Sequence, residues 1–155
     1  DRQYYVRGCT ALLDALGGAI HHIAKVHRYA REEDRPEKTL FIITTDGMEN
    51  ASHKYSFHKV KKMVEKEKEK YGWEFLFLGA NIDAIEVAGR VGIGADRAIN
   101  YDCDREGTAL NYQVLSETVS AVRKSRSRVE MNQTISACCA SIREDYKKRH
   151  KNRRA

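Results

Sequence analysis

Residues 39–45 read TLFIITT and run directly into the polar segment DGMEN at residues 46–50. A continuous run of β-branched and aromatic residues is typical of a strand that is buried on both faces of a parallel sheet. Asp, Gly and Asn favour tight turns, so we expect this strand to end at Asp46. Open α/β sheets bind ligands beyond the carboxyl ends of their strands. Residues 46–50 are therefore the first candidate site.

Strand and helix patterns alternate along the rest of the chain. Further strands are expected at residues 73–78 (WEFLFL) and 98–101. Apolar residues at helical spacing predict helices over residues 10–31, 57–70 and 84–91, another from about residue 107 or 108, and one more after residue 129. Thr10 is the expected N-cap of the first helix, because its hydroxyl can accept a hydrogen bond from a first-turn amide. This order predicts an α/β fold with a Rossmann-like parallel sheet and flanking helices.

The charge of the chain divides it into two parts. The 155 residues carry a formal charge of +6, but residues 121–155 hold 11 Lys and Arg against 3 Asp and Glu. The remainder is slightly acidic. We therefore predict an α/β domain over residues 1–130 and a helical, basic C-terminal extension over residues 131–155. The charged run EKEKEK at residues 65–70 is interpreted as a solvated helix face.

The spacing of the cysteines and the shortness of the apolar runs indicate where in the cell the protein lies. Cys9, Cys103, Cys138 and Cys139 form no CxxC pair, which argues against a zinc knuckle and a disulfide framework. Reduced thiols favour a cytoplasmic location. The adjacent Cys138 and Cys139 are interpreted as helix-packing residues, with a redox pair or a metal site as the alternative. No apolar run approaches the roughly 20 residues needed to cross a bilayer, so no membrane interaction is expected.

Oxygen-bearing side chains are expected to gather at the carboxyl edge of the sheet. The residues expected there are Gly8, Thr10, Asp46, Gly47, Asn81 and Asp83. A hydroxyl and a carboxylate, completed by water, suit Mg²⁺ or Mn²⁺. A capping Thr and a turn Asp are also common for purely structural reasons, so spacing alone leaves both interpretations open.

Four segments of the chain form a recognisable set: RGCTALLDALG at residues 7–17, FIITTDGMENAS at residues 41–52, KYGWEFLFLGANIDA at residues 70–84 and the D-x-E-G-T motif at residues 104–108. Together they resemble the later portion of a bacterial von Willebrand factor type A (VWA) domain. The resemblance covers most of residues 4–125. It implies a partial VWA fold with three of the usual six strands.

The resemblance also implies a metal-ion-dependent adhesion site (MIDAS). In the family this site combines an Asp-x-Ser-x-Ser motif with a separate Thr and a separate Asp, and Thr10 and Asp46 match the last two. No Asp-x-Ser-x-Ser occurs in this sequence. We therefore expect an incomplete site that binds Mg²⁺ or Mn²⁺ weakly, because Mg²⁺ gives up its water reluctantly. An intact site accepts a carboxylate from another protein, which implies protein–protein interaction and not catalysis.

The strand at residues 39–45 lacks a neighbour in this interpretation. An unpaired apolar edge invites pairing with another chain. We therefore expect either that these residues belong to a longer protein, or that a homodimer covers the exposed strand.

Other interpretations predict different functions. The basic residues of segment 121–155 could bind nucleic acid or an acidic partner, which is the alternative function. His21, His22 and His27 lack the i,i+4 spacing that two helical metal ligands need, so no zinc site is expected. Cys9 at a helix start could be a nucleophile, but no orienting third group accompanies it, and we expect no enzyme.

Overall fold

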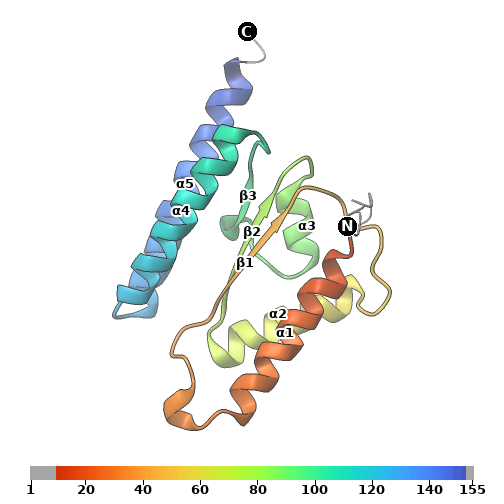
Figure 1. Cartoon of the computed structure of the whole chain (residues 1–155), viewed down its shortest axis with the longest axis vertical. Coiled ribbons are helices and arrows are strands. Elements are labelled where there is room, and N and C mark those ends of the chain that lie inside the picture. The colour runs from red at the N-terminus through yellow and green to blue at the C-terminus, as the bar shows by residue number, and fades with distance from the viewer. Residues whose placement is uncertain (1–9, 153–155) are drawn as a thin grey trace, which may run out of the picture.

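The computed structural model describes residues 10–152 (Figure 1). Gly8 and Cys9 lie outside the described residues. The elements are α1 (Leu12–Tyr29), η1 (Glu32–Asp34), β1 (Leu40–Thr45), α2 (Phe57–Tyr71), β2 (Glu74–Gly79), α3 (Ala84–Arg90), η2 (Ala95–Arg97), β3 (Ala98–Asn100), α4 (Arg105–Lys124) and α5 (Arg128–Asn152). None of the helices within residues 10–152 is long and apolar enough to span a membrane.

The three strands form one parallel sheet in the order β1-β2-β3. β1 pairs with β2 from Leu40 opposite Glu74 to Thr45 opposite Gly79. Each crossover contains a helix, as parallel strands require. The predicted α/β class, with a Rossmann-like parallel sheet flanked by helices, is confirmed.

Helices cover both faces of the sheet (Figure 1). Side chains alternate along β2, so that Phe75 and Phe77 pack against α1, α2 and α3. Leu76 and Leu78 face the other way and pack against α4 and α5. β2 is buried over its whole length because it has a neighbour on each side and helices above and below.

The prediction that residues 39–45 are buried on both faces is wrong for β1. Its four apolar residues, from Leu40 to Ile43, are only half-buried, and Thr44 is exposed. The reason is topological, since β1 is an edge strand and no described strand pairs with its other side. The run TLFIITT thus has the composition of a central strand in an edge position.

The predicted N-cap of the first helix is also wrong. α1 begins at Leu12 after Ala11, and no side chain caps it. Thr10 instead forms an isolated parallel bridge with Glu49. The other helix starts follow the usual rule, since Ser56, Asp83 and Asp104 cap α2, α3 and α4 with their side chains.

The helix predicted as a C-terminal extension packs into the body of the fold. Met131, Ile135, Cys139 and Ile142 lie on one stripe of α5 and are buried against β2, β3 and α4. The Arg97 guanidinium adds polar contacts to α5, donating to Ser136 Oγ (2.9 Å) and Asn132 Oδ1 (3.0 Å). Residues 131–142 therefore belong to the core of the α/β domain. The burial of Cys139, with Cys138 half-buried beside it, agrees with the packing interpretation of this pair.

The solvated face predicted for residues 65–70 needs one correction. Glu67 is buried, although Lys66, Glu69 and Lys70 are exposed. Its position on α2 points it toward α1 and not toward solvent.

Candidate functional site

The start of α1 and the turn after β1 lie together at the carboxyl edge of the sheet. The N–H of Asn50 donates to the Thr10 carbonyl (3.1 Å), and the N–H of Thr10 donates to Asn50 Oδ1 (2.8 Å). Thr10 Oγ1 would lie 3.2 Å from a Cβ placed on Gly47. The structure therefore brings Thr10 beside the Asp46-Gly47 turn.

Glu49 holds this arrangement from within the turn. Its carboxylate accepts hydrogen bonds from the Leu13 N–H (2.8 Å), the Ala51 N–H (3.1 Å), the Ser52 N–H (2.8 Å) and the Ser52 hydroxyl (2.8 Å). Partial burial opposes ionisation, but these hydrogen bonds outweigh it and lower the pKa of Glu49. The first turn of α1, which has no side-chain cap of its own, is thus tied to residues 49–52.

Asp14 makes the reciprocal connection from α1 to the loop. Its carboxylate accepts from the N–H groups of His53 (3.0 Å), Lys54 (2.9 Å) and Tyr55 (2.9 Å). These hydrogen bonds, of which the one from the His53 N–H has the largest effect, lower the pKa of Asp14. Sequence reasoning assigned neither Glu49 nor Asp14 a role. The only signal was their place beside the two segments expected to meet.

We expect this pair of carboxylates to make the fold sensitive to acid. A lowered pKa in the folded state contributes stability above the unfolded pKa and loses it as pH falls through the folded value. Urea unfolding should therefore show a falling free energy of unfolding between about pH 5 and about pH 2. The variant Glu49→Gln should lose about 2 kcal/mol near neutral pH, and its deficit should shrink in acid.

The exposed Glu69 on α2 offers a matched control. Glu69→Gln should change the free energy of unfolding near neutral pH by less than about 0.5 kcal/mol. A Glu49→Gln deficit that stays constant down to the lowest pH would contradict an electrostatic role for Glu49.

The residues that the structure describes do not fit a tight MIDAS-type metal site. Asp46 is exposed, and the Glu49 carboxylate is already occupied by backbone N–H groups. Within residues 10–152, no group of three or more His, Cys, Asp or Glu side chains could hold a metal ion. Thr10 and Asp46 alone offer one hydroxyl and one carboxylate, too few to replace the water shell of Mg²⁺.

Asn81 and Asp83 follow β2 and have mainly local roles. Asp83 Oδ1 accepts from the N–H groups of Ile85 (3.0 Å) and Glu86 (3.1 Å) and so caps α3. Asn81 has a φ of 58°, in the left-handed region where Asn is better tolerated than most residues. Both line a polar cavity of about 490 Å³, which also contacts Asp102 and His150.

A second cavity, of about 310 Å³, lies between the end of β1 and α4. Asp46, Thr108 and Asn111 are among its lining residues. Asn111 is buried, and neither of its side-chain amide atoms has a hydrogen-bond partner among the described residues. Tyr101 lines both cavities, and burial, with smaller contributions from Cys103 and Asp46, raises its pKa.

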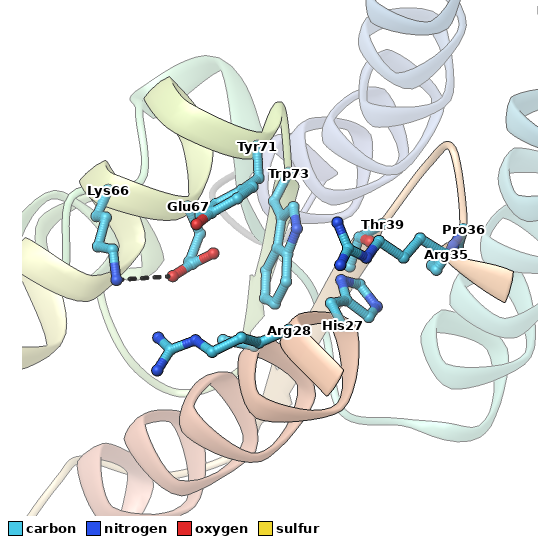
Figure 2. Close-up of a pocket in the computed structure, with 10 residues that line it drawn as sticks. His27, Arg28, Arg35, Pro36, Thr39, Lys66, Glu67, Tyr71 and Trp73 are labelled. Carbon is cyan, nitrogen blue, oxygen red and sulfur yellow. Dashed lines mark ion pairs between the residues drawn. The ribbon is translucent and has the colours of Figure 1, made fainter. Parts of the chain in front are cut away.

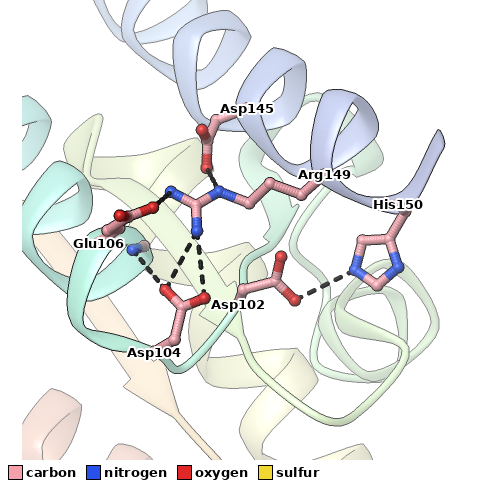
Figure 3. A network of polar contacts seen from close by, with 7 residues as sticks. Asp102, Asp104, Glu106, Asp145, Arg149 and His150 are labelled. Atoms are coloured by element: carbon pink, nitrogen blue, oxygen red, sulfur yellow. Dashed lines mark hydrogen bonds and ion pairs between the residues drawn. The ribbon is translucent and has the colours of Figure 1, made fainter. Parts of the chain in front are cut away.

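The C-terminal end of α5 closes over the loop between β3 and α4 (Figure 3). Arg149 contacts Asp104 (3.1 Å), Glu106 (3.4 Å) and, through Nε, Asp145 (2.7 Å). His150 Nε2 lies 3.1 Å from Asp102 Oδ1. The sequence does not predict this cluster, because three of its four carboxylates, those of Asp102, Asp104 and Glu106, come from a segment about 45 residues before Arg149.

Contacts within the fold engage some of the basic residues of segment 121–155. Arg149 is engaged with carboxylates, and Arg143 donates to the carbonyls of Ala95 (2.8 Å) and Ala98 (3.1 Å). Lys147, Lys148 and Lys151 remain exposed. Part of the positive charge expected to attract nucleic acid is therefore used inside the fold, and nucleic-acid binding stays a prediction.

The histidines of α1 do not cluster. His21 and His22 are exposed, while the His27 ring packs edge-on against Trp73 with centroids 5.2 Å apart.

A scan against protein-family models found no match to this chain, and searches of curated proteins and of solved structures found none either.

Proposed function

We propose that this chain is a protein-interaction module of the VWA type, and that it pairs with its partner through the open edge of β1. The observation that carries the proposal is the state of β1. It has the apolar composition of a central strand, lies at the edge of the sheet that residues 10–152 form, and leaves its four apolar side chains half-buried. An exposed edge of this kind is a template for a further strand.

The backbone of β1 offers hydrogen-bonding groups to that further strand. The N–H of Glu74 donates to the Thr39 carbonyl (2.9 Å), and the N–H of Ala80 donates to the Thr45 carbonyl (2.9 Å). Backbone groups alternate in direction along a strand, so every second residue of β1 directs its N–H and C=O away from β2. The residues whose backbone N–H and C=O groups point away from β2 are Leu40, Ile42 and Thr44.

Helix α4 provides one wall beside this edge. It lines the cavity of about 310 Å³ together with Thr44 and Asp46, and its Tyr112 is 72% exposed there. Near the start of β1, the Lys38 ammonium donates to the carbonyls of Val122 (3.0 Å) and Ser125 at the end of α4. An added strand would therefore cover apolar side chains of β1 and reach Tyr112 on α4.

A second copy of this chain is the partner to which we commit. Two β1 edges related by a twofold axis pair antiparallel, and the same residues then serve both sides. A partner carboxylate bridged by a metal at Asp46, as in an intact MIDAS, receives less support because the described residues offer too few ligands.

The experiment measures molar mass by light scattering at high micromolar concentration. The unaltered chain should be a dimer, and Thr44→Pro should weaken dimerisation at least about tenfold because it removes an N–H that faces outward. Thr44→Val, which keeps that N–H, is the matched control and should remain dimeric.

Thr44→Lys provides a second variant that blocks the edge by charge without constraining the backbone. Circular dichroism should show that each variant keeps its helices. A monomeric unaltered chain, or folded Thr44→Pro and Thr44→Lys variants that still dimerise, would overturn the proposal.

A further inference from the structure

A cavity of about 230 Å³ lies at the opposite end of the sheet, where β1 and β2 begin (Figure 2). Helices α1 and α2 form two of its walls, and the loop before β1 forms a third. The polar and aromatic side chains that line it include His27, Arg28, Arg35, Lys66, Glu67 and Trp73. Only Thr39 and Trp73 come from the strand starts, so the cavity is separate from the carboxyl edge described above.

Glu67 is the unusual member of this lining. Its residue is 3% exposed, and Oε2 has no hydrogen-bond partner among the described residues. Oε1 lies 3.8 Å from Lys66 Nζ, which is an ion-pair distance and too long for a hydrogen bond. A buried carboxylate oxygen without a donor is costly, so such a group in a cavity wall calls for an explanation.

Positive charge surrounds this carboxylate. Arg28, Arg35 and Lys66 are exposed at the cavity, so its lining carries three cations against the single charge of Glu67. Arg35 Nε is fixed by the Ala30 carbonyl (3.2 Å), which leaves the end of its guanidinium for another acceptor. Figure 2 shows the Arg28 and Arg35 side chains on different sides of Trp73.

Trp73 gives the cavity a fixed wall. Its ring stacks on Phe41, with centroids 5.4 Å apart and planes 13° apart, and makes a T-shaped contact with the His27 ring. Because Trp73 is itself buried and stacked on Phe41, its side chain cannot turn to satisfy Glu67 without disturbing the packing.

We propose that this cavity binds a small anion that also carries an N–H donor. The donor binds the Glu67 carboxylate, and the anionic group binds the free end of the Arg35 guanidinium. Two kinds of metabolite share this chemistry: an acidic amino acid, through its ammonium and carboxylate groups, and a guanine mononucleotide, through its ring N–H groups and phosphate. A bare anion would leave Glu67 without a donor, and a purely cationic ligand would be repelled by the arginines.

Titration calorimetry with L-glutamate, guanosine 5′-monophosphate and inorganic phosphate distinguishes the two sources. One of the first two should bind, and inorganic phosphate should bind at least about tenfold more weakly. Trp73 is the single tryptophan of the chain, so L-glutamate binding should also change its fluorescence.

Variants then test the two parts of the site. Glu67→Gln and Arg35→Gln should each weaken binding of the same ligand about tenfold, because each removes a charge-assisted hydrogen bond. Lys62→Gln, on the exposed side of α2, is the control and should leave the affinity unchanged. Because Arg35 is exposed, its variant keeps the test valid even where Glu67→Gln fails to fold.

Two outcomes would overturn the proposal. One is that neither L-glutamate nor guanosine 5′-monophosphate binds. The other is that a ligand binds equally well to folded Glu67→Gln or Arg35→Gln. A strong energetic coupling between Arg28 and Glu67 in the free protein, measured by a double-mutant cycle, would also count against the proposal. It would show that Arg28 already satisfies the Glu67 carboxylate.

Discussion

Replacing Ile135 with alanine should lower the free energy of unfolding by about 3 kcal/mol. Ile135 is fully buried on α5, in the cluster that α5 shares with Leu76, Leu78 and Ile99 of the sheet. Truncation removes buried apolar surface and leaves a cavity that the surrounding strands cannot fill. Urea unfolding, followed by circular dichroism, measures the change.

Val129 provides the matched control on the same helix. It is 66% exposed, so Val129→Ala should change the free energy of unfolding by less than about 0.5 kcal/mol. Equal, small effects of both substitutions would mean that the packing of α5 on the sheet contributes little to the stability of the fold.

Replacing Gly107 with alanine should cost about 2 to 4 kcal/mol. A Cβ at this position would lie 2.2 Å from the backbone carbonyl oxygen of Asp102. The loop cannot easily yield, because the Gly107 N–H donates to Asp104 Oδ1 (2.7 Å) and Arg149 holds the same carboxylate. Thermal unfolding should therefore show a clearly lowered midpoint.

Gly18 is the control for the effect of removing a glycine from a helix. A Cβ there meets nothing within 4 Å, so Gly18→Ala should stabilise the protein by about 0.5 to 1 kcal/mol. A neutral Gly107→Ala would show that the loop between β3 and α4 adjusts, and that the contacts of Arg149 do not fix it.

The alternation of strands and helices could be predicted because each element carries its own local pattern. TLFIITT and WEFLFL are β-rich runs between turn residues, and the amphipathic spacing of residues 57–70 marks a helix. Since alternation favours right-handed parallel crossovers, the three-stranded sheet followed from the order of elements.

The details that failed depend on contacts between distant segments. Thr10 does not cap α1, because residues 49 and 50 engage that end of the chain, and no local pattern announces this pairing. The buried residues of α5 recur about once per turn among small and uncharged polar neighbours (MNQTISACCASI at residues 131–142), so they produce only a weak periodicity. Glu67 looked solvated because its neighbours in EKEKEK are charged, while its burial depends on α1.

At the carboxyl edge of the sheet, the sequence predicts that the start of α1 and the turn after β1 lie together. It does not predict which side chains hold these two segments in place. Thr10 and Asp46 were singled out as oxygen ligands. The carboxylates with the most hydrogen bonds nearby belong to Glu49 and Asp14, and all their partners except the Ser52 hydroxyl are backbone amides. Backbone donors carry no sequence signal, so these roles become visible only in three dimensions.

The division of the core between two sheet faces also has a consequence for synthesis of the chain. The face covered by α1, α2 and α3 can be complete soon after Ala98 has left the ribosome. The opposite face, with Leu76, Leu78 and Ile99, waits for α5 to supply residues as late as Ile142. We therefore expect the nascent chain to pass through a stage in which helices cover one face of its sheet while the apolar side chains of the other face stay exposed until α5 has been made.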